Sequence, residues 1–271
     1  MQFLTATVSR VGDRKMNQDR VKILSRDDTI LLILGDGLGG RPGGEFASQT
    51  LINIACRLFD RIEIPIKEPM VFMQDLLETT HKAIVEEGAR QDPPINPGTT
   101  AVLCLIQQGH AWWNHVGDSR LYLFRAGQMV ERTQDHSVVE NMLAGGQINA
   151  DMSDGHPLRN VVTRCLGMSK NPPIISLSQK TTLKAGDIIL LCSDGFWEPL
   201  NENRLGTRLF ENRLKDALED MAEQAEKINS PQSDNVSAIA LQIMSLNLRT
   251  HGINPAIKAP HPNTIKPSGQ S

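Results

Sequence analysis

Aspartates at the ends of apolar segments are the residues of this sequence best placed to do chemistry. In three places an apolar run leads into a small residue, an aspartate and then a glycine or serine. These segments are Leu34-Gly35-Asp36-Gly37, Val116-Gly117-Asp118-Ser119 and Cys192-Ser193-Asp194-Gly195. Two more aspartates precede apolar runs: Asp19 before Val21, and Asp234 before Val236. Each of the five carboxylates is therefore expected at one end of a core strand.

Carboxylates in such positions need a compensating charge. Aspartate is a poor strand residue, and an ionised carboxylate at a core edge is costly unless it is paired or bound to metal. Mg²⁺ and Mn²⁺ prefer oxygen ligands, and an ion held by them activates water and neutralises a leaving oxygen. The alternative is an ordinary turn after each strand, which is our interpretation of Asp27-Asp28 and Asp154-Gly155. The pattern alone leaves both interpretations open.

Other catalytic motifs are absent from the sequence. The seven histidines show no zinc-binding spacing, and there is neither a P-loop nor a G-x-S-x-G serine-hydrolase elbow. The glycines of residues 35–40 have G-x-G spacing, but Asp36 would repel a pyrophosphate. A dinucleotide site is therefore not indicated.

The composition is that of an ordinary globular protein. The chain has 271 residues, 39% of them hydrophobic, and 28 basic against 31 acidic residues give a net charge of −3. This balance argues against nucleic-acid binding by bulk electrostatics. The four cysteines are far apart, which favours a reducing compartment over a disulfide framework. With no signal peptide and no apolar run long enough to span a bilayer, we expect a cytoplasmic protein without membrane contact.

Hydrophobic periodicity predicts an α+β fold. Residues 21–24 and 29–34 form a hairpin whose second strand is buried on both sides, and residues 43–60 and 69–89 form amphipathic helices with Phe46 and Val71 among the inward positions. Residues 99–106, 111–116 and 119–124 are expected to form an antiparallel meander. Residues 135–145 and 203–228 have helical patterning, and 188–192 and 236–243 are further strands.

Taken in order, several motifs resemble the metal-dependent protein phosphatases of the type 2C family, especially the compact bacterial members. The resemblance covers residues 5 to 243. Its motifs are Gly12-Asp13-Arg14 through Asp19, Gly35-Asp36-Gly37-Leu38-Gly39-Gly40 with Gly44-Glu45-Phe46-Ala47-Ser48, Gly98-Thr99-Thr100, Gly117-Asp118-Ser119-Arg120, Thr133-Gln134-Asp135-His136-Ser137, Ser193-Asp194-Gly195 and Asp234-Asn235-Val236.

The resemblance implies a four-layer αββα sandwich with two central antiparallel β-sheets flanked by helices, plus a flap subdomain at about 146–166. The catalytic domain would cover residues 1–245, and residues 246–271 would be a disordered tail. Two Mg²⁺ or Mn²⁺ ions would be bridged by Asp36, with the Gly37 carbonyl on one and Asp194 and Asp234 on the other. Asp19 would act through bound water, and Asp118 would hold a third ion.

The same resemblance implies that a metal-bridging hydroxide attacks phosphoserine or phosphothreonine directly, with Arg14 holding the substrate phosphate. Many eukaryotic members have a histidine where this chain has Leu38, so the general acid is undefined and a metal-bound water is preferred. Glu45 is expected to orient a bound water or cap its helix, and Thr99 and Thr100 to support the site. Asp135 and His136 are expected to cap a helix rather than to take a catalytic role.

Three functional hypotheses remain from the sequence. The first is an active phosphatase, acting as a monomer on phosphorylated Ser/Thr proteins and opposing a cognate eukaryotic-like Ser/Thr kinase. The second is a non-catalytic metal-binding relative that acts as a signalling module, against which the presence of Asp36, Asp194 and Asp234 argues. The third is a metal-dependent nuclease, which the acidic charge balance disfavours. In the flap, Arg159 or Arg164 could contact substrate or simply be solvated.

Overall fold

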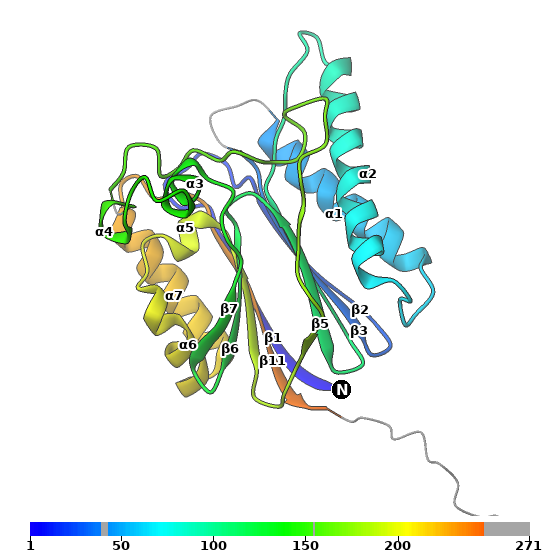
Figure 1. Cartoon of the computed structure of the whole chain (residues 1–271), viewed down its shortest axis with the longest axis vertical. Coiled ribbons are helices and arrows are strands. Elements are labelled where there is room, and N and C mark those ends of the chain that lie inside the picture. Colours follow the sequence, from blue (N-terminus) through cyan, green and yellow to red (C-terminus); the bar gives the residue numbers. More distant parts are fainter. Residues whose placement is uncertain (39–42, 154, 247–271) are drawn as a thin grey trace, which may run out of the picture.

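Two antiparallel β-sheets lie face to face, and helices cover the outer face of each (Figure 1). The computed structural model describes residues 1–38, 43–153 and 155–246. The first sheet has the order β1-β11-β10-β6-β7 and the second the order β2-β3-β4-β5-β8, with β9 also paired to β5. The predicted four-layer αββα sandwich is thus confirmed.

The strands of the first sheet are β1 (Gln2–Arg10), β6 (Arg120–Arg125), β7 (Gln128–Arg132), β10 (Ile188–Cys192) and β11 (Val236–Ser245). Those of the second are β2 (Asp19–Arg26), β3 (Thr29–Asp36), β4 (Ala101–Gln107), β5 (His110–Val116), β8 (Ser176–Leu177) and β9 (Thr181–Thr182). The helices are α1 (Gly44–Arg61), α2 (Pro69–Arg90), α3 (Val138–Ala144), α4 (Ala150–Ser153), α5 (Asp194–Trp197), α6 (Glu202–Glu211) and α7 (Leu214–Asn229). None of the helices in the described ranges is both long and apolar enough to cross a bilayer.

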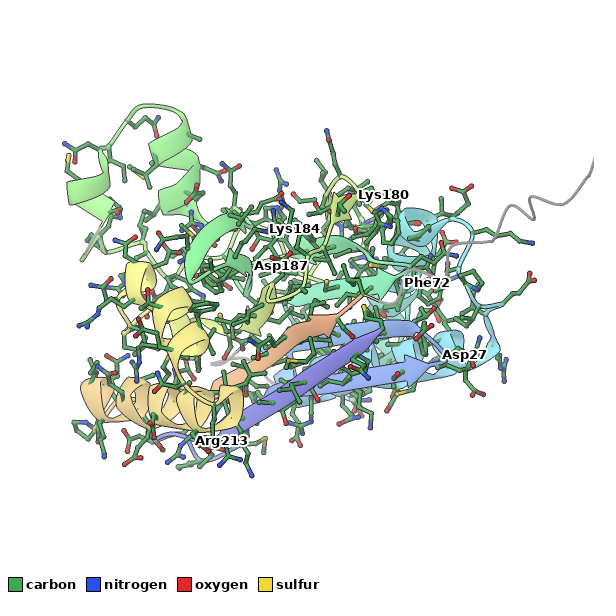
Figure 2. The ribbon with its side chains drawn as sticks, turned by 90° about the horizontal axis from the view of Figure 1, so that it is seen from below. Asp27, Phe72, Lys180, Lys184, Asp187 and Arg213 are labelled. Atoms are coloured by element: carbon green, nitrogen blue, oxygen red, sulfur yellow. The ribbon has the colours of Figure 1, made fainter. Side chains whose placement is uncertain are left out.

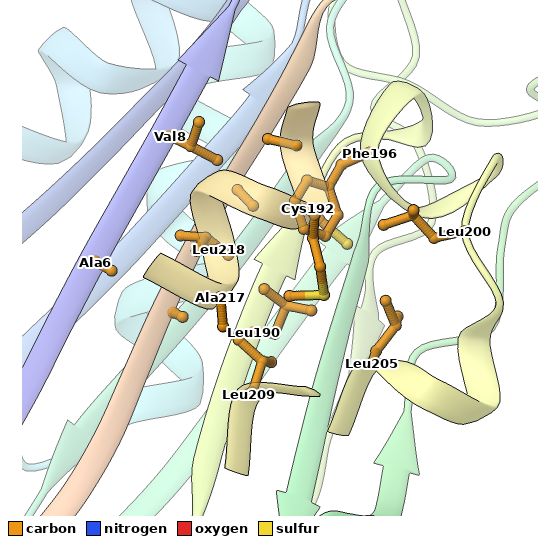
Figure 3. Packing of buried hydrophobic residues seen from close by; sticks show 14 of the residues in the cluster. Ala6, Val8, Leu190, Cys192, Phe196, Leu200, Leu205, Leu209, Ala217 and Leu218 are labelled. Atoms are coloured by element: carbon orange, nitrogen blue, oxygen red, sulfur yellow. The ribbon is translucent and has the colours of Figure 1, made fainter. Parts of the chain in front are cut away.

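Three apolar layers hold the sandwich together. One fills the space between the sheets and includes Leu32, Trp113 and Leu191. A second packs α1 and α2 onto the second sheet, and a third packs α5, α6 and α7 onto the first sheet. In Figure 3 the third layer joins Val8 of β1 and Cys192 of β10 to Leu218 of α7. Burial of these surfaces from water is the main force that positions the strand ends.

The apolar run of β3 is buried along its length, as predicted for a central strand. The β2–β3 hairpin turns at Asp27, which lies at the opposite end of the strands from Asp36 and is labelled in Figure 2. That figure also labels Phe72 of α2 and Arg213 beside α7, from the two outer helical layers. Asp27-Asp28 is thus a turn, as expected, whereas Asp154 lies outside the described residues.

The predicted meander of three strands is wrong. Strands β4 and β5 pair in the second sheet, but β6 pairs with β10 and β7 in the first. The chain crosses between sheets at Gly117-Asp118-Ser119, where Gly117 has a φ of +109° that favours glycine. A crossing and a hairpin turn demand the same local residues, so the sequence pattern did not separate them.

Several helix predictions also need correction. Helix α3 begins at Val138 with the Ser137 side chain as its N-cap, so neither Asp135 nor His136 is a cap. The stretch 203–228 is two helices, α6 and α7. The side chains of Phe46 and Val71 are 39% and 53% exposed, so they do not point into the core as predicted. Of residues 246–271, where the disordered tail was predicted, all but Leu246 lie outside the described residues.

Candidate metal centre

Asp36 is held at the end of β3 by hydrogen bonds from the neighbouring strand. Its backbone N–H donates to Thr100 Oγ1 at 3.0 Å, and its carbonyl oxygen accepts from the Thr99 hydroxyl at 2.9 Å. Asp19, on the adjacent strand β2, is its direct cross-strand partner. The two threonines therefore fix the backbone of Asp36 and leave its carboxylate available, in agreement with their expected supporting role.

Asp194 and Asp234 come from the first sheet. Asp194 follows β10 and begins helix α5, where its Oδ1 accepts from the Gly195 N–H at 2.6 Å. Asp234 precedes β11, and its Oδ1 accepts from the Asn235 N–H at 2.8 Å. Its other oxygen, Oδ2, accepts from Arg14 Nη2 at 2.8 Å. In each of these two carboxylates, one oxygen thus accepts a hydrogen bond from the backbone N–H of the next residue.

Asp118 lies in the crossing between the sheets and is 6% exposed. Its carbonyl oxygen accepts from the indole N–H of Trp197 at 3.1 Å. The Arg120 guanidinium lies 3.3 Å from the centroid of that indole ring and binds both carboxylate oxygens of Asp135, at 2.8 and 2.7 Å. Asp135, expected to cap a helix, instead anchors the arginine that packs beside the Asp118 loop.

These residues surround one cavity of about 500 Å³ at the end of the sandwich. Its walls contain most of the predicted site residues: Arg14, Asp36, Gly37, Asp118, Asp194 and Asp234. Asp19 does not line it but is buried behind it, where its Oδ2 accepts from the Ser193 hydroxyl at 2.9 Å. The structure therefore brings together residues that are up to 220 positions apart in the chain.

Burial and mutual repulsion make these carboxylates hard to ionise. Burial, followed by repulsion from the neighbouring aspartates, raises the pKa of Asp36 and of Asp194 well above its usual value. For Asp118, burial and the charge of Asp135 raise the pKa to about 7. For Asp19, burial raises the pKa to about 6 despite the hydrogen bond from Ser193. Such a cluster is stable in its charged form only beside a cation.

The donor set fits a hard divalent cation. Every candidate donor is an oxygen, and Asp19 Oδ1 is a buried acceptor without a hydrogen-bond partner. In the part of the chain that the structure describes, no three acidic, histidine or cysteine side chains already converge closely enough to hold an ion by themselves. Ions here would complete their coordination with water and the Gly37 carbonyl, as Mg²⁺ commonly does.

Other predicted residues occupy different places. Glu45 neither caps α1 nor reaches the cavity, because its Oε1 accepts from Arg20 Nη2 at 2.5 Å. Leu38 lines the cavity and donates its backbone N–H to the Gly98 carbonyl. In the flap, Arg159 pairs with Glu198, and neither it nor Arg164 lines the cavity.

The sequence interpretation missed several lining residues. Lys15, Met16 and Gln18 lie between two predicted site residues, so their proximity could have been inferred from Arg14 and Asp19. Asn160 and Val162 come from the flap, and no local pattern marks them. The backbone bridge between Ser137 and Val162 is what brings this part of the flap over the cavity.

Comparison with known proteins identifies a family that this chain resembles over most of its length. The sequence model for "Protein phosphatase 2C" matches residues 8–233. The chain is 28% identical over 231 residues to the serine/threonine protein phosphatase PstP of Mycobacterium tuberculosis, covering 85% of this chain but only 43% of PstP. It is 30% identical over 188 residues to the protein phosphatase PhpP of Streptococcus pneumoniae, covering 68% of this chain and 75% of PhpP.

Solved structures show the same fold. Serine/threonine phosphatase Stp1 from Staphylococcus aureus has a TM-score of 0.83 at 26% identity, covering 90% of this chain and 96% of that one. The catalytic domain of PstP in complex with two manganese ions has a TM-score of 0.75 at 26% identity, covering 90% of this chain and 99% of that one. The family match spans most of the chain and includes every residue that lines the carboxylate cavity except Asp234, which directly follows it. The chain belongs to the protein phosphatase 2C family.

Proposed function

We propose that this chain is a metal-dependent protein serine/threonine phosphatase that hydrolyses phosphoserine and phosphothreonine. The observation that carries the proposal is the convergence of Asp36, Asp118, Asp194 and Asp234 with Arg14 on one cavity. Oxygen ligands for a cation and a guanidinium for a phosphate are the two requirements of metal-assisted phosphate-monoester hydrolysis. The similar proteins PstP and Stp1 are named serine/threonine phosphatases and PhpP a protein phosphatase, which supports this activity.

Asp36, Asp194 and Asp234, with the Gly37 carbonyl, would hold two ions, and Asp19 would contribute through water. The two manganese ions of the PstP structure support this number. Asp118 would hold a third ion, and either Mg²⁺ or Mn²⁺ suits an all-oxygen donor set. When bound, the ions would lower the pKa of a water to produce the attacking hydroxide and neutralise charge on the phosphoryl oxygens.

The chain's own residues would orient the substrate. Arg14 is 52% exposed at the mouth of the cavity and can present its planar guanidinium to two phosphate oxygens. Its present partner, Asp234 Oδ2, would turn to a cation once one is bound, which frees Arg14 for the phosphate. Leu38 offers no proton, and no histidine lines the cavity within the described residues, so water would protonate the leaving alkoxide.

The partners would be phosphorylated Ser/Thr proteins, and by analogy with bacterial relatives we include a cognate Ser/Thr kinase and its targets. We propose that the chain acts as a monomer. The wide spacing of the four cysteines in the sequence, with no C-x-x-C pair, supports a reducing, cytoplasmic location.

The test is hydrolysis of a phosphothreonine peptide with Mn²⁺ or Mg²⁺, beside a plasmid-nicking assay. We expect peptide hydrolysis without nicking, and a loss of at least about 100-fold for Asp194→Asn, equivalent to about 2.7 kcal/mol. Asp216→Asn, at an exposed position on α7, is the matched control. A metal-loaded protein without turnover would support the non-catalytic alternative, and nicking without peptide hydrolysis would support a nuclease.

A further inference from the structure

His136 lies behind the Asp118 loop, between the crossing of the two sheets and the flap. The residue is 7% exposed and does not line the carboxylate cavity. Its backbone N–H donates to the Gly117 carbonyl oxygen at 2.9 Å, and its own carbonyl oxygen accepts from the Thr163 N–H at 2.7 Å. His136 therefore connects the residue before Asp118 to the part of the flap that contains Val162.

The imidazole ring of His136 adds a second connection to Gly117. Its Nδ1 accepts from the Gly117 N–H at 3.1 Å, so in the neutral ring the proton is on Nε2. Nε2 then donates to the Ser176 hydroxyl oxygen of β8 at 2.8 Å. A neutral imidazole has one acceptor and one donor, and both are used here.

The surroundings keep this ring neutral and fix its plane. Burial, followed by the charges of His115 and Arg164, lowers the pKa of His136 to about 3. The His115 ring stacks on it with the centroids 4.6 Å apart and the planes at 15°. His115 is held in turn by a hydrogen bond between its Nε2 and the Gln134 carbonyl oxygen. The Nδ1 lone pair of His136 is therefore directed at Gly117 near neutral pH.

Gly117 is packed closely on its other side against Thr100. Its φ is +109°, and a Cβ there would lie 2.6 Å from the Thr100 side-chain methyl. The Thr100 and Ser119 hydroxyls are hydrogen-bonded at 2.7 Å. The residues on both sides of Asp118 are thus held by side chains, and His136 supplies the contact to the backbone N–H of Gly117.

We infer that His136 is a positioning residue for the third ion, whose ring holds the backbone before Asp118 so that the carboxylate keeps the orientation that a cation needs. This inference rests on the proposed role of Asp118 as the ligand of that ion. Residues that orient a metal ligand without touching the ion contribute about 10- to 100-fold to metal affinity. The effect should be confined to the third ion, because Asp36, Asp194 and Asp234 are held by other contacts.

Two substitutions separate the roles of the two ring nitrogens. His136→Asn places an amide oxygen close to the position of Nδ1, where it can accept from Gly117, but its side chain is too short to reach Ser176. His136→Gln extends toward Ser176 and leaves the Gly117 N–H without its acceptor. The matched control is His110→Gln, which makes the same exchange at the opposite end of β5 from Gly117.

The experiment is a Mn²⁺ titration of the full chain at neutral pH, in which the electron paramagnetic resonance signal measures the free ion. The third ion is identified as the one that Asp118→Asn no longer binds. We expect His136→Gln to bind this ion about tenfold more weakly than the wild type, and His136→Asn to recover most of the loss. Both variants should bind the two strong ions normally, which also shows that they are folded. His110→Gln should bind all three ions as the wild type does.

The inference is overturned if His136→Gln binds the third ion as tightly as the wild type. It is equally overturned if His136→Asn and His136→Gln lose the same affinity, because the contact with Gly117 would then not matter, or if the strong ions are lost as well. If Asp118→Asn binds as many ions as the wild type, there is no third ion to position and the inference fails. Phosphopeptide hydrolysis by the wild type, measured on the same samples, tests the proposed function separately.

Discussion

Asp19 and Asp36 are direct cross-strand partners in the β2–β3 ladder, so both carboxylates lie on one face at the same end of the sheet. The Ser193 hydroxyl donates to Asp19 Oδ2 at 2.9 Å, and Ser193 precedes Asp194 of the other sheet. The carboxylate site is therefore built across the interface between the two sheets. Its geometry depends on the apolar layer between them, which fixes the relative position of the strand ends.

Replacing Asp36 should separate function from stability. Burial and four neighbouring carboxylates raise the pKa of Asp36 well above its usual value, so its charge is unfavourable when no cation is bound. Asp36→Asn should abolish phosphopeptide hydrolysis and yet stabilise the metal-free protein by about 1 kcal/mol near pH 8. Urea unfolding in EDTA measures the second effect. A variant less stable than the wild type under those conditions would show that the charge on Asp36 does not destabilise the metal-free fold.

The pH dependence of the stability of the metal-free protein should reveal the ionisation of Asp118. Burial and Asp135 raise its pKa to about 7, so the native state holds this proton more tightly than the unfolded state does. The contribution of Asp118 to stability is therefore largest near pH 4 and is lost as the pH rises to 7. Asp118→Asn cannot ionise, so its stability advantage over the wild type should be absent near pH 4. Above pH 7 it should reach on the order of 4 kcal/mol.

Urea unfolding of both proteins in EDTA from pH 4 to 8 tests this prediction. The comparison cancels the contribution of the buried histidines, which both proteins share. With saturating Mn²⁺ the advantage of Asp118→Asn should shrink, because the ion favours the ionised carboxylate. A stability difference that does not vary with pH would contradict the raised pKa.

Arg14 should matter for substrate binding and hardly at all for folding. It is 52% exposed, and an exposed ion pair such as the one with Asp234 contributes about 0–1 kcal/mol. Arg14→Ala should therefore leave the unfolding midpoint nearly unchanged and raise KM for a phosphothreonine peptide about tenfold. Arg14→Lys keeps the positive charge but not the planar guanidinium that can bind two phosphate oxygens. Its KM should therefore lie between those of Arg14→Ala and the wild type. Unchanged steady-state kinetics in both variants would show that Arg14 does not contribute to substrate binding.

Removing only one partner of the buried ion pair between Arg120 and Asp135 should strongly destabilise the fold. Both oxygens of Asp135 accept from the guanidinium, and the side chains of Arg120 and Asp135 are 10% and 7% exposed. Arg120→Met leaves Asp135 charged, buried and unpaired, at an expected cost of about 3–5 kcal/mol. The double variant Arg120→Met/Asp135→Leu should recover most of that cost. Unfolding curves of the single and double variants decide this, and additive effects would contradict a coupled pair.

Local periodicity was enough to predict the main helices and the central strand. Even the opposition of Asp19 and Asp36 could have been deduced, because a two-residue turn at Asp27-Asp28 pairs Arg26 with Thr29 and fixes the register from there. What local patterns could not give was the partner of each strand. Gly117-Asp118-Ser119 suits a hairpin turn as well as a crossing between sheets, and only the packing of both sheets decides between them.

The candidate site shows the same difference between what local sequence patterns predict and what depends on contacts between distant residues. The aspartates could be selected because a carboxylate at a strand end is unusual, and the family resemblance then supplied a set of roles. Asp135 was misassigned because its partner, Arg120, is 15 residues away and the ion pair has no local signature. Asn160 and Val162 were missed for the same reason, since their place over the cavity depends on a backbone bridge from the flap to Ser137.

The most direct test of the central claim is anomalous diffraction from crystals soaked in Mn²⁺, which locates each ion without assuming a coordination scheme. We expect two strong peaks inside the cavity lined by Asp36, Asp194 and Asp234, with a third, weaker peak beside Asp118. In crystals of Asp194→Asn at least one of the strong peaks should be lost. A wild-type cavity without anomalous density at saturating Mn²⁺ would contradict the account.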